Sequence, residues 1–434
     1  RLGIKPLYYG WSNHVFLFGS ELKSFKRNPA FQTDINRDAL CLYMRHNYIP
    51  APHSIYQNIY KLLPGTYITI NAAQLDQAVT PQFYWSLEDV VAAGMENPFR
   101  GSAEEAINEL EVLLKDSVRL RMIADVPLGA FLSGGVDSST VVALMQAQSS
   151  IPVKTFTIGF NEERFNEALY AREVAAHLGT DHTELYVTPK EAMDVIPRLP
   201  ALYDEPYSDS SQIPTFLVSQ LARRHVTVSL SGDGGDELFG GYTRYTFAQN
   251  IWRWIGWQPQ EIRSVLSGLL GVPSIEQWRK TIHLLEPVLP ESLHQILIAD
   301  KLHKFRAILR CRNDREVYER VISHWLNPND IVINGHEPMT VVNDPAQWPK
   351  IDNFVSWMMA MDLVSYLPDD ILVKVDRASM GVSLEARVPL LDDHRLVEFA
   401  WRLPLSMKIR KGKSKWLLRQ VARTPSSGKP VSTM

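Results

Sequence analysis

Cysteine is nearly absent from this sequence of 434 residues, which contains only Cys41 and Cys311. A disulfide framework and a four-cysteine zinc site are therefore excluded, and so few cysteines are typical of the reducing cytosol. The chain also lacks an excess of charge, because 45 Lys and Arg stand against 48 Asp and Glu. That balance excludes the basic footprint of a dedicated nucleic-acid-binding protein. No apolar run approaches the roughly 18 residues that a membrane span needs, so we expect a cytoplasmic protein that binds neither nucleic acid nor membrane.

An initiator methionine is missing too, as is a charged-then-apolar signal segment, because the sequence opens Arg1-Leu2-Gly3-Ile4. We therefore expect the sequence to begin inside a domain. The length favours about three domains, and the polar tail over 424–434 predicts disorder.

The first part of the chain, up to Trp85, has a β-rich pattern. Short strands are expected at Tyr8-Tyr9 and at 15–18, around a turn at Asn13. A helix is expected over 36–48, with Asp34 or Asn36 as its cap. A Pro64-Gly65 turn predicts a hairpin over 61–70. The Gly- and Pro-containing segment 88–101 predicts a linker.

Strands and helices alternate in the next part. Ser102 and Glu105 have the spacing of a capping box, and apolar residues then recur at helical intervals. Such alternation predicts an α/β fold with a doubly wound, mostly parallel sheet. The region 252–336, rich in Trp and Leu, predicts an all-helical extension, and helices are expected over 354–405. Strands are expected at 128–132, 153–160, 183–187 and 226–230, and helices at 138–148 and 167–178.

One loop carries the strongest chemical signal. Ser133-Gly134-Gly135-Val136-Asp137-Ser138-Ser139 directly follows an expected strand and precedes an expected helix. Glycine amides and a helix N-terminus together bind anions, and Asp137 is suited to the magnesium that accompanies a nucleotide. The alternative is a glycine-rich turn capped by serines. The segment is not a Walker-type loop, and Gly412-Lys413-Ser414 is no match either, because the required first glycine falls on Met407.

A second loop follows the expected strand 226–230. It carries three carboxylates within five residues, Asp233, Asp236 and Glu237. Acids of one sign are costly to pack together unless they meet a metal or a cationic substrate group. A solvated acidic turn is the alternative. Because strand ends of a parallel sheet meet at one edge, we expect this loop to lie near the first.

Three motifs in order resemble the glutamine-hydrolysing asparagine synthetases, a family of N-type ATP pyrophosphatases joined to a glutaminase. They are SGGVDSS at 133–139, SLSGDGGDELFGGY at 229–242 and LEARVPLLD at 384–392. Gly19-Ser20-Glu21-Leu22-Lys23 and Leu63-Pro64-Gly65 are similar to parts of the family's glutaminase domain. The resemblance implies a partial glutaminase domain over 1–95 and an ATP pyrophosphatase domain, with its helical extension, over 96–434.

The resemblance implies a role for each matching residue. Leu132 and Ile158 would line the adenine and ribose site, with Ser231 and Gly232 also touching ATP. Asp233 stands where the family often has Glu, at a position tied to forming the acyl-adenylate, and Asp236 and Glu237 would face the amino acid or ammonia. Pyrophosphate and magnesium would be held by Ser133, Gly134, Gly135, Asp137, Ser138 and Ser139, with Asp137 as the metal ligand.

Cationic groups are needed as well, because charge builds on the phosphates as pyrophosphate leaves. Lys374, Arg377 and Arg387 are the candidates. The alternative is that they brace helices through ion pairs, which is the commoner role of such residues.

The sequence departs from the family's pattern at both ends. The family's glutaminase uses an N-terminal cysteine, whereas residue 1 is Arg, and neither Cys41 nor Cys311 fits that role. Beyond Leu418 the family continues with helices and a Lys-Gly loop that reaches the pyrophosphate, and here a polar tail follows. We therefore do not expect this chain to hydrolyse glutamine.

The expected function is that of a ligase in asparagine and amino-acid biosynthesis. Aspartate, ATP and glutamine or ammonia would be its small-molecule partners, ATP and Mg²⁺ its cofactors, and a homodimer is left open. Two alternatives remain: a related amidotransferase or β-lactam-forming ligase acting on another carboxylate, and a truncated remnant that only binds nucleotide.

Overall fold

A computed structural model of the chain describes residues 1–71, 77–161, 166–271, 277 and 299–423. Residues group into two compact units, which we treat separately. The first unit comprises residues 1–241, 327–350 and 359–434, and the second comprises 242–326 and 351–358. Among the described residues no helix is long and apolar enough to cross a bilayer.

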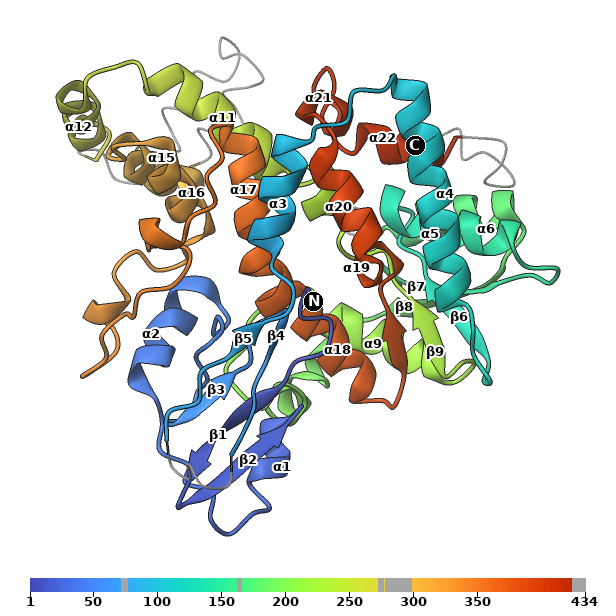
Figure 1. Cartoon of the computed structure of the whole chain (residues 1–434), viewed down its shortest axis with the longest axis horizontal. Helices are drawn as coiled ribbons and strands as arrows, with labels where there is room; N and C mark the ends of the chain where they lie inside the picture. The colour runs from blue at the N-terminus through green and yellow to red at the C-terminus, as the bar shows by residue number, and fades with distance from the viewer. Residues whose placement is uncertain (72–76, 162–165, 272–276, 278–298, 424–434) are drawn as a thin grey trace. The chain divides into compact units, whose positions relative to one another are not determined.

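The first unit begins with a small antiparallel sheet (Figure 1). Strands β1 (Tyr8–Ser12) and β2 (Val15–Gly19) are joined by a turn in which Asn13 and His14 have φ angles of 45° and 64°. This turn confirms the expected hairpin around Asn13. Helix α2 (Arg37–His46) is capped by the Asn36 side chain, as predicted, and α1 spans Leu22–Phe25.

The hairpin expected around Pro64-Gly65 is wrong. A turn does form there, because Thr66 N donates to Leu63 O, but the strands on its two sides have other partners. Strand β3 (Ile59–Lys61) pairs with β1, and β4 (Thr66–Tyr67) pairs with β5 (Gln82–Phe83). Long-range pairing therefore replaces the local pairing that the turn residues favoured.

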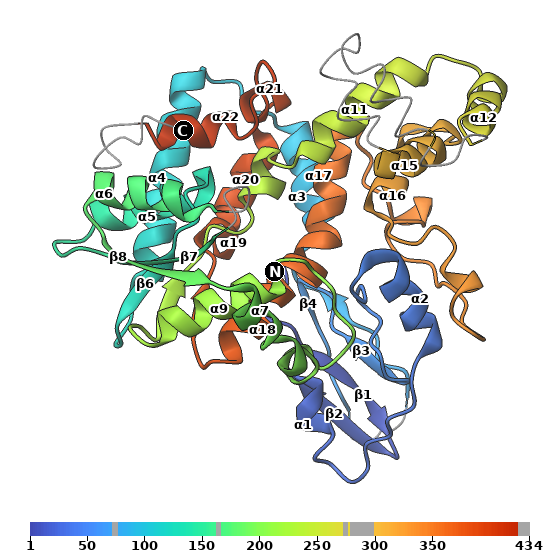
Figure 2. The same cartoon turned by 180° about the vertical axis from the view of Figure 1, so that it is seen from behind.

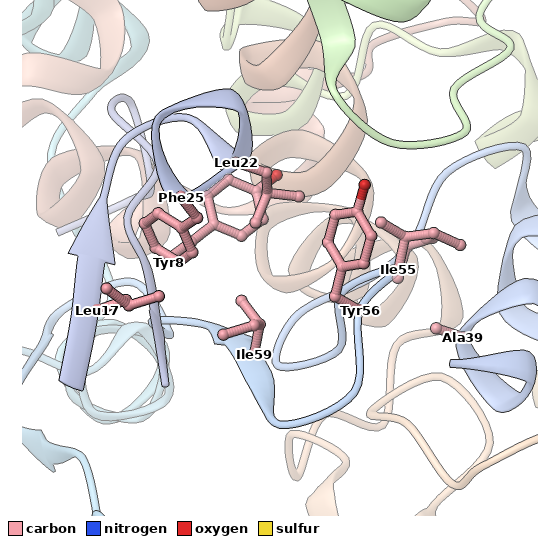
Figure 3. Close-up of a cluster of buried hydrophobic side chains, with 9 residues drawn as sticks. Tyr8, Leu17, Leu22, Phe25, Ala39, Ile55, Tyr56 and Ile59 are labelled. Carbon is pink, nitrogen blue, oxygen red and sulfur yellow. The ribbon is translucent and has the colours of Figure 1, made fainter. Parts of the chain in front are cut away.

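A cluster of buried apolar side chains fills the space between these strands and α2. Figure 3 shows most of its members around the Tyr8 and Tyr56 rings. The cluster contains Tyr8, Leu17, Leu22, Phe25, Ala39, Ile49, Ile55, Tyr56 and Ile59.

The prediction of a linker over 88–101 is also wrong for most of that segment. Ser86 caps a helix there, α3 (Leu87–Glu96), with Glu88 and Asp89 in its first turn. Gly94 acts as a packing contact and not as a helix breaker, because a Cβ at this position would lie 2.8 Å from the backbone of Trp401 on α20 (His394–Arg402). The next helix, α4 (Ala103–Arg121), has the predicted Ser102–Glu105 capping box.

A five-stranded sheet organises the rest of the first unit. Its strand order is β10-β9-β6-β7-β8, and all neighbours are parallel, which confirms the predicted parallel sheet. One strand, β10, falls in a region expected to be helical, because a three-residue strand carries no periodic pattern. The strands are β6 (Leu128–Phe131), β7 (Lys154–Phe160), β8 (Asp181–Val187), β9 (Val228–Leu230) and β10 (Glu385–Arg387).

Helices cover both faces of this sheet, as a doubly wound fold requires (Figures 1 and 2). Helices α5 (Val136–Ala147) and α6 (Ala168–Leu178) pack on one face, with α4 outside α5. Helices α9 (Gln212–Arg223) and α18 (Leu372–Met380) pack together on the other, and a π-helical turn, η5 (Leu367–Ile371), leads into α18. The unit also contains α7 (Pro189–Met193), η2 (Ile196–Arg198), α8 (Leu199–Tyr203), α10 (Gly235–Phe239), α19 (Pro389–Asp392), α21 (Leu405–Lys408) and α22 (Trp416–Val421).

The second unit is helical in its described part, in agreement with the expected helical extension. It contains α11 (Thr243–Ile255), α12 (Gln260–Leu269), α15 (Ala299–Leu309), α16 (Asp314–Ile322) and the first residues of α17 (Phe354–Val364). The expectation of helix as far as His336 is wrong, because beyond Ile322 the chain forms loops with short turns at η3 (Pro328–Asp330) and η4 (Pro345–Gln347). Part of the expected extension, and the tail over 424–434, lie outside the described residues.

Candidate active site

The loop Ser133–Ser139 lies at the carboxyl end of the central strand β6 and opens helix α5. Its hydroxyls organise it, because Ser138 Oγ accepts from Ser133 N at 3.2 Å and lies 3.0 Å from Ser133 Oγ. Gly134 has a φ of 76°, and a Cβ there would lie 2.7 Å from Ala171 N on α6. Glycine is therefore required at this point, and the free amides of the α5 N-terminus suit the loop to an anion.

The second predicted loop, Ser231–Glu237, follows β9 and packs directly against the first. A Cβ on Gly232 would lie 2.6 Å from Ser138 N, and one on Gly235 would lie 2.6 Å from Asp137 Oδ2. The structure thus brings the two motifs together at one edge of the sheet, where parallel α/β folds bind their ligands.

Carboxylates from both loops face each other at this edge. Burial raises the pKa of Asp137 to about 6; the Lys415 charge opposes that rise, and Asp236 and Asp233 add to it. Burial also raises the pKa of Asp233, although Ser231 Oγ donates a hydrogen bond to its carboxylate. Glu237, on α10, is buried as well.

Lys415 is the cation at this site, and sequence reasoning missed it. Its Nζ donates to Asp137 Oδ2 and lies 2.8 Å from Asp236 Oδ1. Its backbone, with a φ of 54°, caps the N-terminus of α22 and donates to Phe239 O. Burial lowers the pKa of Lys415, but the Asp137 and Asp236 charges outweigh that effect, so its pKa is raised.

Two buried polar atoms at the first loop take no hydrogen bond from the described part of the chain. They are Asp137 Oδ1 and Ser139 Oγ. Buried polar atoms without partners mark places where a ligand supplies the missing bond. The chain offers no group of three or more His, Cys, Asp or Glu side chains for a metal within its described ranges. Magnesium commonly takes one or two carboxylates and completes its shell with phosphate oxygens, so Asp137 fits such an ion alongside a nucleotide.

Lys374 lies close to this cluster, on α18. Its Nζ donates to Ser211 Oγ at 2.7 Å and lies 3.3 Å from Asp209 Oδ1. Its charge also acts on Asp233, whose pKa it lowers against the effect of burial. Lys374 therefore pairs with Asp209 and Ser211 and acts on the acidic cluster only through its charge.

The two candidate arginines are held elsewhere. The Arg387 guanidinium donates to Arg121 O at 2.8 Å and to Ile123 O at 2.7 Å, and pairs with Glu385. Only its carbonyl reaches the site region, where it accepts from Ser231 N.

Arg377 has a similar bracing position. It donates to Ser20 O and lies 3.4 Å from Glu21 in the β-rich segment. For both arginines the geometry favours the bracing alternative.

The expected adenine-site residues lie at neighbouring strand ends. Leu132 follows β6, is buried and donates its N–H to Phe156 O on β7. Ile158 is half-buried on β7, among apolar side chains. Leu132 thus directly precedes the first loop, and Ile158 lies on the strand that pairs with β6.

Neither cysteine is presented for catalysis. Cys41 and Cys311 are both buried, and burial raises the pKa of each thiol, that of Cys311 to about 12. A reactive cysteine needs an accessible thiolate, so both thiols are suited to packing.

Comparison of the sequence with known proteins identifies two family models that match successive parts of the chain. The family model of asparagine synthase matches residues 109–426, and that of a glutamine amidotransferase domain matches residues 1–85. The chain is similar to asparagine synthetase [glutamine-hydrolyzing] 1 of Bacillus subtilis, with 31% identity over 97% of this chain and 61% of that protein. A putative asparagine synthetase [glutamine-hydrolyzing] 2 of Methanocaldococcus jannaschii is 33% identical over 88% of this chain and 68% of its own length.

A more distant relative has another name. Amidase chry2 of Gibberella zeae is 25% identical over 94% of this chain and 61% of its own length. The chain therefore spans about three-fifths to two-thirds of the length of these relatives. With a family model matched over most of its residues, and with both loop motifs joined at one sheet edge, the chain belongs to the asparagine synthase family.

Proposed function

We propose that the chain is an ATP-dependent amide ligase that converts aspartate to asparagine, with ammonia as the nitrogen donor, which a complete glutaminase would supply from glutamine. The observation that carries this proposal is the meeting of Lys415 with Asp137 and Asp236 at the glycine-rich loop. The relatives' names support the substrate assignment. The match of residues 1–85 to a glutamine amidotransferase domain supports the nitrogen source.

The first step activates a carboxylate. A side-chain oxygen of aspartate attacks the α-phosphorus of ATP, and the bond from that phosphorus to the bridging oxygen breaks. Pyrophosphate leaves, and β-aspartyl-AMP remains. The loop amides and the hydroxyls of Ser133 and Ser139 would hold the departing pyrophosphate, and Lys415 would stabilise the charge that it gains. Asp137 would hold magnesium through its unpartnered Oδ1, and the bound ion would neutralise phosphate charge.

The second step forms the amide. Ammonia attacks the acyl carbon, the bond from that carbon to the AMP oxygen breaks, and the nitrogen loses a proton. Adenylation is needed because a free carboxylate is a poor acyl donor, whereas AMP is a good leaving group. Asp233 and Asp236 would attract the cationic groups of the substrate, since their carboxylates lie beside the loop.

A second candidate function keeps the adenylation and changes the acceptor. The relative named Amidase chry2 favours it, because that protein matches nearly the whole chain under another activity name. The phosphate-binding residues would serve either reaction equally, so the acceptor must be determined by experiment.

Pyrophosphate and AMP release by the purified chain, with Mg·ATP, ammonium and one carboxylate at a time, tests the proposal. We expect release to depend on aspartate. Release with another acid but not with aspartate would establish the second candidate. Binding of Mg·ATP in calorimetry without AMP formation from any acid would reduce the chain to a nucleotide-binding protein.

A further inference from the structure

One stretch of the first unit contacts both the β-rich segment (residues 1–85) and Lys374, and the steps above give it no role. It comprises residues 204–211, between α8 and α9, and we call it the bridging segment. Its first half, 204–208, contacts the β-rich segment, and its second half, 209–211, contacts α18. The bridging segment therefore connects the N-terminal strands to a helix near the other end of the sequence.

Glu205 has three contacts with the β-rich segment. Its Oε1 accepts from the Tyr8 hydroxyl at 3.1 Å and lies 2.6 Å from Lys61 Nζ. Its Oε2 accepts from Ile55 N at 3.2 Å. The Lys61 and Glu205 side chains are only 7% and 6% exposed, so salt and solvent screen their attraction little. Because all three partners belong to the β-rich segment, Glu205 fixes the bridging segment to it.

The residues on either side of this glutamate are held by the same part of the chain. Asp204 is buried; its Oδ2 accepts from Lys23 N at 3.3 Å, and its Oδ1 lies 3.6 Å from Lys23 Nζ. The Ser208 backbone N–H donates to Asn47 O at 2.9 Å. Residues 204–208 are therefore held against the β-rich segment at both ends as well as at the central glutamate.

The second half of the bridging segment holds the Lys374 ammonium group. Asp209 Oδ1 accepts from Ser211 N at 2.7 Å. Lys374 Nζ donates to Ser211 Oγ at 2.7 Å and to Asp209 Oδ1 at 3.3 Å. Since Lys374 is buried, the position of its charge follows the position of these two acceptors.

A cavity of about 550 Å³ separates the β-rich segment from the start of α18 and the third motif. Val373, which precedes Lys374, lines it together with Leu391. Leu391 also packs on the acidic loop, because a Cβ on Gly234 would lie 2.4 Å from Leu391 Cδ2. Burial raises the pKa of Asp233, the residue before Gly234, and the Lys374 charge is one of the influences that oppose this rise.

We propose that Glu205 is a positioning residue, which docks the bridging segment on the β-rich segment and thereby fixes Asp209 and Ser211, the residues that hold the Lys374 ammonium group. This inference rests on the proposed function, in which Asp233 attracts a cationic group of the substrate. With Lys374 displaced, Asp233 would lose a charge that favours its ionised form. The segment that matches an amidotransferase domain then contributes to the synthetase reaction even when ammonia is added directly.

Hydrogen exchange tests the positioning without turnover. In Glu205→Gln the side chain loses its charge, and its NH₂ group cannot accept a hydrogen bond, so the bridging segment should loosen. We expect the amides of 204–212 to exchange at least about tenfold faster, while those of the five-stranded sheet keep their wild-type rates. Unchanged exchange at 204–212 would overturn the proposal. Faster exchange throughout the chain would overturn it too, because it would indicate a role in global stability.

Kinetics test whether Glu205 acts through Lys374. Pyrophosphate release is measured with Mg·ATP, aspartate and ammonium, so that no glutamine is needed. Glu205→Gln should lower kcat about 10- to 100-fold and leave the KM for Mg·ATP within about twofold, because the phosphate loop keeps its own hydrogen bonds. Lys374→Met should lower kcat at least as much, and adding Glu205→Gln to it should cost no more than about twofold further.

A matched control makes the same chemical change in a buried pair on α4. The Glu111 side chain is 9% exposed and lies 3.0 Å from Lys115 Nζ. Glu111→Gln should lower the urea midpoint of unfolding, because it breaks this pair. It should nevertheless keep wild-type kcat and wild-type exchange at 204–212.

Two kinetic outcomes would overturn the inference. One is a double variant whose loss of kcat is the product of the two single losses, because Glu205 would then not act through Lys374. The other is a loss of kcat in Glu111→Gln equal to that in Glu205→Gln. If another acid replaces aspartate as the substrate, the same comparison is made with that acid. If no acid yields pyrophosphate from the wild-type chain, the proposed function fails, and hydrogen exchange at 204–212 alone decides whether Glu205 holds the bridging segment.

Discussion

Lys415 Nζ donates a hydrogen bond to Asp137 Oδ2 across 278 positions of sequence. The same ammonium group lies 2.8 Å from Asp236 Oδ1. One cation thus joins the glycine-rich loop, the acidic loop and the N-terminus of α22. Both ends of the Asp137 pair are nearly buried, with side-chain exposures of 12% and 13%, so the charge acts in a medium that screens it little.

We predict that Lys415→Met lowers the rate of aspartate-dependent pyrophosphate release by about 100- to 1000-fold, the cost of removing one group that stabilises transition-state charge. The physical reason is that the departing pyrophosphate would lose the cation that pairs with both motif loops. Stopped assays of pyrophosphate at saturating Mg·ATP measure this effect on kcat.

Lys413→Met is the matched control, because Lys413 is exposed and lies in the same loop. It should retain wild-type kcat. Equal losses in the two variants would show that the loop, and not the Lys415 charge, is what the reaction needs.

The sheet and both motif loops could be predicted from the sequence, because each loop follows a short apolar strand and carries a local pattern of glycine, serine and acid. The sequence did not reveal Lys415 as part of the site. The neighbouring Lys413 and Ser414 look like the end of a Walker-type loop, but the spacing to the preceding glycine excludes that motif. The contact of Lys415 with Asp137 depends on how α22 packs, which the sequence does not show. One sequence feature could have pointed to Lys415: the apolar pair Leu417-Leu418 just after it, which is buried and anchors the helix that Lys415 caps.

Two other sequence-based predictions, those for β10 and for Gly94, were wrong because they too depend on long-range contacts. Strand β10 has three residues and no alternation, so only its pairing with β9 reveals it. Gly94 suggested a helix break, yet it lies inside α3 because the backbone of Trp401 approaches there. Both features depend on contacts between segments far apart in the sequence, which local propensity does not report.

The glycines that join the two loops give a second prediction. Gly232→Ala should raise the KM for Mg·ATP about tenfold or more, because its Cβ would lie 2.6 Å from Ser138 N and must displace the phosphate-binding loop. Gly268→Ala on α12 is the control, since among the described residues no atom outside its own stretch of helix lies within 4 Å of the Cβ that alanine would add. That change should leave the KM unaltered. A normal KM in Gly232→Ala would contradict the tight contact between the loops.

Arg387 is predicted to stabilise the fold and not to act on ATP. Arg387→Met removes two hydrogen bonds from a cation to the carbonyls of Arg121 and Ile123. The free energy of unfolding should fall by about 2 to 4 kcal/mol, measured by urea titration, while kcat of the folded fraction stays within about twofold. A large loss of kcat without loss of stability would restore the catalytic role that the third motif suggested.

Asp369 gives a prediction about pH. Its Oδ2 accepts from Ala51 N at 2.9 Å, and burial raises its pKa from 3.8 to about 6, although the Lys61 charge opposes the rise. The folded chain therefore holds this proton more tightly than the unfolded chain does. The resulting contribution to stability is complete below about pH 4 and is lost as the pH rises through about 6.

The uncharged Asn of Asp369→Asn still accepts the Ala51 hydrogen bond but does not titrate. Between about pH 4 and pH 7, the free energy of unfolding of this variant should therefore rise relative to wild type by about 3 kcal/mol. Urea titrations across this range measure the difference, and Asp194→Asn, at an exposed position, should show no such trend. A difference between Asp369→Asn and wild type that stays constant with pH would mean that Asp369 ionises in the folded chain as readily as in the unfolded chain. The Lys61 charge and the Ala51 hydrogen bond would then fully offset the cost of burying that carboxylate.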